Sequence, residues 1–292
     1  MADVKLENRE LRVGVNLHGA ELVSLVRKSD DREYMWSGDP AFWGRVSPVL
    51  FPFVGKLKDG GYVYKGNVIS GVPQHGYARD SEFVPAERTE DTAWFELVPD
   101  ETWKSRYPFD FLLRIGYRLE GASVHVMWTV KNTSSEDMFF SIGAHPAFVM
   151  PEGCSKVGCA LDFHIPSNRL CAGELNEDGL LKPERRSFPL SGGKLILTEE
   201  LFDRDALIID SADLHTVSLE GPDGKAFIQV RFDAPQLGIW SPVGKKAPFV
   251  CIEPWFGRSD RVGYEGDLSG REYGNTLLPG HSFNKEYVID IL

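Results

Sequence analysis

The chain has 292 residues, of which 42% are hydrophobic, and it carries a formal net charge of -11 at pH 7. This length and apolar content are enough to bury a large core, so the chain is expected to be a folded protein and not a tail or a linker. Lys and Arg are interspersed with acidic residues. A nucleic-acid partner is therefore not expected, because neutralising a phosphate backbone requires a basic stripe.

The N-terminal segment and the cysteines indicate the compartment. Met1–Glu7 is charged and lacks the apolar region of a signal peptide, and no run of about eighteen apolar residues follows. Neither export nor membrane insertion is expected, and the predicted location is cytoplasmic. Cys154, Cys159, Cys171 and Cys251 are predicted to be free thiols, because disulfides are rare in a reducing cytosol. The spacing of Cys154 and Cys159 is not that of a standard zinc pair.

Most predicted elements are short strands in which apolar and polar residues alternate. In chain order they are Glu21–Val26, Trp94–Leu97, Leu112–Leu119, Ser123–Lys131, Phe227–Phe232 and Tyr287–Ile291. In Ser123–Lys131 the residues at 124, 126, 128 and 130 are apolar and face one side, which leaves His125 on the other side. This pattern is typical of a half-buried strand.

Turn signals separate these strands, and helix signals are scarce. The turns are predicted at Asp59–Gly61, Lys65–Asn67, Ser191–Gly193 and Pro222–Gly224, and short helical turns at Asp39–Trp43 and Glu199–Phe202. The Pro- and Gly-rich segment 142–153 interrupts this pattern and is interpreted as a loop. Many short strands with such punctuation predict an all-β fold, an antiparallel sandwich or barrel. No linker or repeat divides the chain, so residues 1–292 are predicted to form one domain.

Three segments far apart in the chain each place an ionisable side chain among Gly, Pro and aromatic residues. They are Pro73–Arg79, Gly143–Phe148 and Cys251–Gly257. Each of His75, His145 and Glu253, taken singly, is more often an ordinary loop residue than a catalyst. Together, two imidazoles and one carboxylate beside aromatic rings are what acid–base chemistry on a sugar requires.

Longer motifs connect these segments to a known family. Ser47–Gly60, Gln74–Asp80, Gly143–Phe148, Leu237–Pro242 and Glu253–Trp255 occur in the order typical of that family and span most of the chain. The sequence resembles aldose 1-epimerase (galactose mutarotase), particularly its compact bacterial branch. The resemblance implies a large antiparallel β-sandwich of the galactose mutarotase type. It also implies an isomerase, without cofactor or metal, that interconverts the α and β anomers of a hexose or hexose phosphate.

The resemblance also implies roles for the three ionisable residues. Mutarotation requires a base that takes the proton of the C1 hydroxyl and an acid that protonates the ring oxygen. Mapped through the family motifs, Glu253 is the expected base and His145 the expected acid. His75 matches the other active-site histidine of the family, which binds the sugar. The expected partner is a small-molecule sugar, with the protein a monomer or a homodimer.

Further residues are expected to bind the sugar. Arg79 contacts a ring hydroxyl or an attached phosphate, or else pairs with Asp80 or Glu82. Lys56 stands where relatives usually carry Arg, so it keeps the positive charge without bidentate geometry. Whether Lys56 contacts the sugar is therefore left open by the sequence.

The sugar-binding carboxylate of the family matches Asp205, although Asp203 is near enough in sequence to make the alignment ambiguous. Trp240 and Trp255 are candidate stacking platforms, with burial in the core as the alternative.

Two other functions stay open. One is a carbohydrate-binding protein on the same scaffold that has lost turnover, since a fold does not determine a function. The other is a metal enzyme in which His75, His145 and Glu253 form a set of two histidines and one carboxylate. No His-x-His or His-x-Asp pair supports this second alternative.

Overall fold

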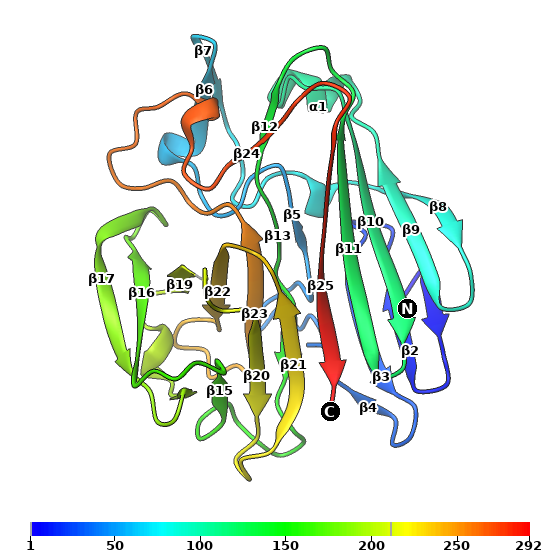
Figure 1. Ribbon diagram of the computed structural model, residues 1–292, viewed down its shortest axis with the longest axis vertical. Coiled ribbons are helices and arrows are strands. Elements are labelled where there is room, and N and C mark those ends of the chain that lie inside the picture. Colours follow the sequence, from blue (N-terminus) through cyan, green and yellow to red (C-terminus); the bar gives the residue numbers. More distant parts are fainter. Residues whose placement is uncertain (1, 211) are drawn as a thin grey trace.

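Strands make up nearly all the regular structure of the computed structural model, which describes residues 2–210 and 212–292 (Figure 1). Two large antiparallel sheets account for most of these strands. The predicted all-β, antiparallel fold class is therefore confirmed. Among the described residues, no helix combines the length and the apolar character needed to cross a lipid bilayer.

The first large sheet has nine strands in the described part of the chain, and its longest members lie together in Figure 1. Across the sheet the order is β18 (Lys194–Ile196), β15 (Ala160–Asp162), β20 (Thr216–Glu220), β21 (Ala226–Phe232), β25 (Ser282–Ile291), β11 (Ser123–Asn132), β10 (Phe111–Glu120), β9 (Thr92–Leu97) and β8 (Val84–Arg88). In β11 the side chains at 124, 126, 128 and 130 are all buried, as the alternation predicts.

The second large sheet carries the candidate site. Its order is β17 (Leu181–Pro189), β16 (Arg169–Leu175), β19 (Leu207–Asp210), β22 (Gln236–Trp240), β23 (Phe249–Phe256), β13 (Ile142–Ala144) and β5 (Val49–Leu50), with β14 (Ala147–Val149) also paired to β23. Segment 142–153 is thus not simply a loop, because it contains β13 and β14. The interpretation of the whole segment as a loop was wrong, because only residues 145–146 and 150–153 lie outside these two strands.

Smaller elements complete the fold. They are a sheet of β1 (Val4–Glu7), β2 (Leu11–Val15), β3 (Leu22–Arg27) and β4 (Arg32–Glu33), the pairs β6 (Gly61–Tyr64) with β7 (Asn67–Ser70) and β12 (Met138–Phe140) with β24 (Asn275–Leu277), the helix α1 (Glu101–Arg106), and the 3-10 turns Lys58–Gly60, Ala78–Asp80, Glu200–Phe202 and Leu268–Gly270. Helix α1 was not predicted. It begins where the Asp100 side chain accepts a hydrogen bond from the backbone of Trp103 at 2.9 Å. The structure has a turn at residues 40–42, where a helical turn was predicted at Asp39–Trp43, but no helix.

The main core contains side chains from both large sheets. Val250 and Ile252 of β23 point into it, as do Leu237 and Ile239 of β22. Because neighbouring strand residues point to opposite faces, the residues at 251, 253 and 255 of β23 lie on the other face of the second sheet. Loops and aromatic side chains cover that face, so all eight residues of β23 are buried.

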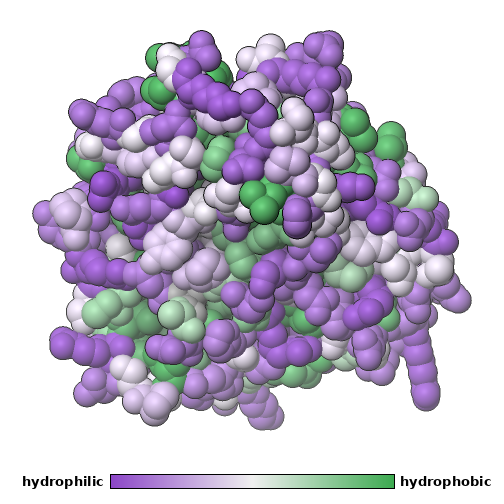
Figure 2. Space-filling view, turned by 45° about the horizontal axis from the view of Figure 1, so that its top comes forward, coloured by the Kyte–Doolittle hydropathy of each residue, from purple (hydrophilic) through white to green (hydrophobic). Residues whose placement is uncertain are grey.

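The surface is polar, in agreement with the charge of the chain. On the face shown in Figure 2, hydrophilic residues predominate and apolar residues are scattered among them. All four cysteines are free thiols, which confirms that part of the sequence analysis.

Candidate active site

The site is built on β23, and the neighbouring strand leaves room for it. Glu253 is 1% exposed and pairs across the sheet with Gly238 of β22. A Cβ atom at Gly238 would lie only 2.5 Å from the indole ring of Trp255. Glycine at position 238 therefore allows the Trp255 ring to lie flat against the sheet beside Glu253.

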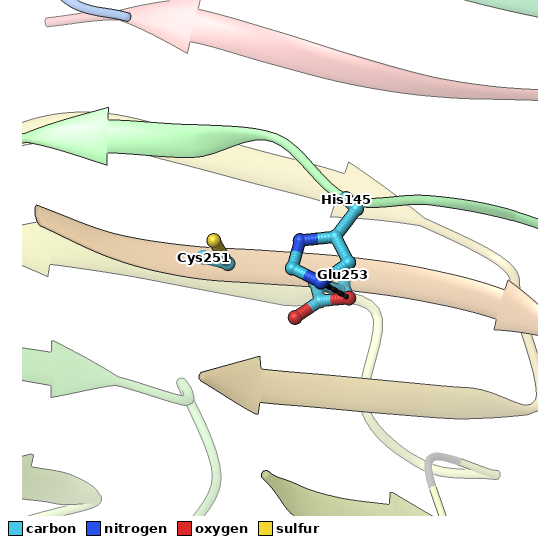
Figure 3. A group of neighbouring side chains, drawn as sticks. All are labelled: His145, Cys251 and Glu253. Carbon is cyan, nitrogen blue, oxygen red and sulfur yellow. Dashed lines mark ion pairs between the residues drawn. The ribbon is translucent and has the colours of Figure 1, made fainter. Parts of the chain in front are cut away.

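His145 lies opposite Glu253 because of the strands on either side of it. Gly143 of β13 pairs with Trp255, and Ala147 of β14 pairs with Cys251, so the connection between them passes alongside position 253. The imidazole points toward β23, with its Nε2 atom 3.3 Å from Oε2 of Glu253 (Figure 3). The structure thus brings the expected acid and the expected base into direct contact.

His75 enters the same site from a tight turn. His75 and Gly76 both have positive φ angles, of 68° and 73°. A side chain at Gly76 would place its Cβ 2.4 Å from the carbonyl oxygen of Phe51, so only glycine fits there. The backbone N–H of Gly55 donates to Nδ1 of His75 at 3.1 Å, so Nε2 carries the proton of the neutral ring, and it lies 3.2 Å from the side-chain amide of Gln74. The rings of His75 and His145 lie 5.6 Å apart.

Two tryptophan rings border His145. The ring of Trp43 stacks on it with centroids 4.7 Å apart, and the ring of Trp240 meets it edge-on at 5.4 Å. Trp255, by contrast, is 4% exposed, donates its indole N–H to the carbonyl oxygen of Ala144, and packs among apolar side chains. Of the two tryptophans singled out from the sequence, Trp240 is therefore the one that borders the histidine.

Burial changes the protonation of all three ionisable groups. It lowers the pKa of His145 to about 3 and holds the pKa of His75 well below its usual value, because the charged rings lose their hydration. Burial, followed by the negative charge of Asp205, raises the pKa of Glu253 well above its usual value. The free protein thus favours neutral forms of His145 and Glu253, whereas their expected roles use an imidazolium and a carboxylate.

The structure distinguishes Asp205 from Asp203 by their surroundings. Asp205 is partly buried, has a φ of 68°, and lies near enough to Glu253 to influence its pKa. One of its carboxylate oxygens accepts a hydrogen bond from the backbone N–H of Ala206 at 2.9 Å. Asp203 is exposed. Asp205 is therefore the carboxylate that borders the site.

Two arginines give the site a positive potential. Nε of Arg79 lies 3.6 Å from Asp80, which also pairs with Arg45 at 2.7 Å, and the Nε atom of Arg79 is buried without a hydrogen-bond partner. Burial and the neighbouring Arg45 lower the pKa of Arg79 to about 10. Both guanidinium groups also lower the pKa of His145 and of His75.

Lys56 follows the Gly55 residue that contacts His75. Its backbone N–H donates to Oγ of Ser259 at 3.1 Å, and its side chain lies against Gly179, where an added Cβ would approach Cδ of Lys56 to 2.8 Å. The Lys56 ammonium makes no ion pair with any residue in the described ranges. Lys56 is partly buried.

The sequence analysis missed two residues of this site, Arg45 and Trp43. Both lie in the irregular segment before β5, which shows no periodicity and was noted only for a helical turn. The metal alternative also named a different set of ligands. Among the described residues, the structure groups His145, Cys251 and Glu253 as potential metal ligands, without His75.

The comparisons with known proteins identify the family of this chain. The model of the aldose 1-epimerase family matches residues 2–290, and the chain belongs to that family. The protein LacX, chromosomal, of Lactococcus lactis subsp. lactis is 32% identical, with 99% of each chain covered.

Two solved structures share the fold over nearly the whole chain. A galactose mutarotase related enzyme of Lactobacillus acidophilus is 35% identical, with a TM-score of 0.92 over 99% of this chain and 97% of that one. A galactose mutarotase-like protein of Lactobacillus casei is 29% identical, with a TM-score of 0.92 over 99% of both chains. The large antiparallel β-sandwich of the galactose mutarotase type, implied by the resemblance, is confirmed.

Proposed function

We propose that this protein is a mutarotase that interconverts the α and β anomers of an aldose by acid–base ring opening. The observation that carries the proposal is the buried contact of 3.3 Å between Nε2 of His145 and Oε2 of Glu253. The family assignment supports an epimerase acting on a sugar. The buried pair supplies the two proton-transfer groups that such a reaction needs.

The chemistry follows from the bonds that must change. Glu253, as a carboxylate, takes the proton of the C1 hydroxyl while His145, as an imidazolium, gives a proton to the ring oxygen. The bond between C1 and the ring oxygen breaks, a C1 carbonyl forms, and rotation about the C1–C2 bond presents the other face. The reverse transfers then close the ring as the opposite anomer. Protons and charges balance at each step without a cofactor.

Burial makes both groups stronger reagents for this reaction. A lowered pKa makes the His145 imidazolium a stronger acid, and a raised pKa makes the Glu253 carboxylate a stronger base. Ring opening converts the charged pair into the neutral pair that burial favours. The reverse transfers at ring closure restore the charged pair for the next turnover.

The surrounding residues are suited to hold the sugar. We assign Nε2–H of His75 as a donor to the anomeric region, and Asp205 and Lys56 as partners of ring hydroxyls. The rings of Trp43 and Trp240 provide apolar faces for the C–H groups of a pyranose. Side chains held at fixed positions bind the sugar in one orientation, which places its reacting oxygens next to the acid and the base.

Arg45 and Arg79 favour an aldose with a negative group, such as a hexose phosphate, over a neutral hexose. Asp80 is the carboxylate that pairs with both guanidinium groups. Glu21, which also lies near Arg79, accepts hydrogen bonds from the backbone of Val46 and Ser47. The Nε of Arg79, which is buried without a hydrogen-bond partner, suits a phosphate, because guanidinium groups bind phosphate oxygens with directed N–H donors.

A panel experiment tests both the reaction and this preference. Saturation transfer between anomeric protons is measured by NMR for hexoses and hexose 6-phosphates at anomeric equilibrium. We expect faster exchange of a phosphorylated aldose, and loss of that preference in Arg79→Met. The exposed Arg106→Met variant serves as the control. Sugar binding without exchange of any aldose would favour the carbohydrate-binding alternative, which Lys56 in place of Arg also leaves open.

A further inference from the structure

Cys251 brings a thiol to the same pocket as His145 and Glu253. It lies two residues before Glu253 on β23, on the same face of the strand (Figure 3). One potential ligand atom from each of the three residues lies within 4.8 Å of the other two. Cys251 is 0% exposed, and it has no part in the anomer exchange proposed above.

The spacing of these atoms fits a zinc ion. In a tetrahedral zinc site with metal–nitrogen and metal–oxygen distances near 2.1 Å, the nitrogen and oxygen atoms lie about 3.4 Å apart. The observed separation between Nε2 of His145 and Oε2 of Glu253 is 3.3 Å. A sulfur ligand would lie about 3.6 Å from the nitrogen. A small movement of the Cys251 side chain therefore completes a set of three ligands.

The chemistry of the ligand set also fits zinc. Nitrogen, sulfur and oxygen ligands together suit Zn²⁺, whereas Mg²⁺ and Ca²⁺ select oxygen ligands. A thiolate, a carboxylate and a neutral imidazole balance the two charges of the ion, so the complex carries no net charge into a buried site. Binding releases the thiol proton and any carboxyl proton to water.

Unsatisfied polar atoms provide a second, independent indication of a ligand. Both carboxylate oxygens of Glu253 and the Nδ1 atom of His145 are buried without a hydrogen-bond partner. The side chains of Glu253 and His145 are 1% and 9% exposed. Buried polar atoms normally have partners, so the two unpartnered oxygens of Glu253 beside Nε2 of His145 indicate a position for a bound group.

We propose that His145, Cys251 and Glu253 form an inhibitory zinc site. Nε2 of His145 and Oε2 of Glu253 are the atoms that exchange protons with the sugar, so an ion bound to them blocks ring opening. Zinc and sugar therefore compete for one pocket. Inhibition rests on the proposed function, whereas zinc binding itself does not.

Cobalt(II) is the probe for binding, because a thiolate ligand gives a charge-transfer absorption that a histidine or a carboxylate does not give. We expect this absorption in the wild type and in Cys171→Ser, which alters an exposed thiol. We expect it to disappear in both Cys251→Ser and Cys251→Ala, each checked for folding by circular dichroism. Absence of the absorption in the wild type, or its survival in both Cys251 variants, overturns the site.

The second measurement is the inhibition of anomer exchange by buffered Zn²⁺, with Mg²⁺ as the control ion. Loss of a metal ligand costs at least about tenfold in affinity, so the inhibition constant for zinc should rise by that factor in both Cys251 variants. Equal sensitivity of the wild type and these variants contradicts the proposal. If the wild type shows no exchange activity, the proposed function is wrong. The cobalt absorption still decides whether the metal binds.

Discussion

The Nε2 atom of His145 lies 3.3 Å from the Oε2 atom of Glu253, and burial moves the pKa values of these two groups in opposite directions. A group with a lowered pKa gives its proton away readily, and a group with a raised pKa takes a proton readily. The site therefore pairs a strong acid with a strong base. Desolvation supplies the largest contribution to each shift.

The substitution His145→Gln removes the acid and keeps an amide of similar size. We expect kcat to fall by roughly 10²–10⁴-fold, the contribution of positioned acid catalysis, with a much smaller change in KM. His125→Gln on β11 is the matched control, because His125 lies on the first sheet and pairs with Glu286. Saturation-transfer NMR measures both variants. A large rise in KM at unchanged kcat would instead make His145 a binding residue.

The pH dependence of kcat/KM reports how many transferable protons His145 and Glu253 hold together. The pair is active while it holds one transferable proton, so activity is lost when it gains a second proton or loses the first. Because the pKa of His145 is lowered to about 3 and that of Glu253 is raised, we expect kcat/KM to stay level from mildly acidic through neutral pH. On the acidic side it should decline only as the pH approaches about 3, and on the basic side once the pH passes the raised pKa of Glu253. An acidic limb near pH 6.5, the usual histidine value, would contradict this.

Glu253→Gln should change stability in a pH-dependent way. A carboxyl group whose folded pKa is raised binds protons more tightly in the native state than in the unfolded state, so its contribution to stability is present at low pH and is lost as the pH rises. Glutamine does not ionise, so the variant does not lose stability at this position as the pH rises. We expect the melting temperature of the variant, relative to wild type, to increase from pH 4.5 upward.

Thermal unfolding followed by circular dichroism at several pH values measures this difference. Glu90→Gln, which alters an exposed carboxylate, is the surface control. A difference between Glu253→Gln and wild type that shrinks as the pH rises would show that Glu253 is ionised in the folded protein without cost.

Asp205 and Asp203 form a natural pair of test and control. Asp205→Asn should raise KM because the amide is a weaker acceptor for sugar hydroxyls. It should also bring the pKa of Glu253 closer to its usual value, since the charge of Asp205 contributes to the shift. Asp203→Asn changes an exposed residue and should leave both quantities unchanged. Steady-state kinetics by polarimetry gives KM for the two variants. A rise in KM in Asp203→Asn but not in Asp205→Asn would assign the binding role to Asp203.

The sequence predicted the long strands well, because alternation is a local property. The buried positions 124, 126, 128 and 130 of β11 follow directly from it. β13 and β14 were not predicted, since each has three residues and forms only because β23 offers an unpaired backbone edge. Helix α1 is also short, with six residues, and its Asp100 cap was not recognised.

The candidate site was predicted in part. His75, His145 and Glu253 lie in recognisable motifs, and the structure brings them together. Arg45 and Trp43 lie in an irregular segment and reach the site only through packing, which leaves no local pattern. The pKa directions could not be predicted either, because they depend on burial created by residues from distant parts of the chain.

The most direct test of the proposed reaction is saturation transfer between the anomeric protons of a hexose 6-phosphate, with wild-type protein and with folded Glu253→Gln. Glutamine has nearly the shape of glutamate but cannot take the proton of the C1 hydroxyl. We expect wild-type protein to exchange the anomers far faster than the spontaneous reaction, and the variant to lose roughly 10²-fold or more of this enhancement. Near-normal exchange by folded Glu253→Gln would show that Glu253 is not the base of the reaction.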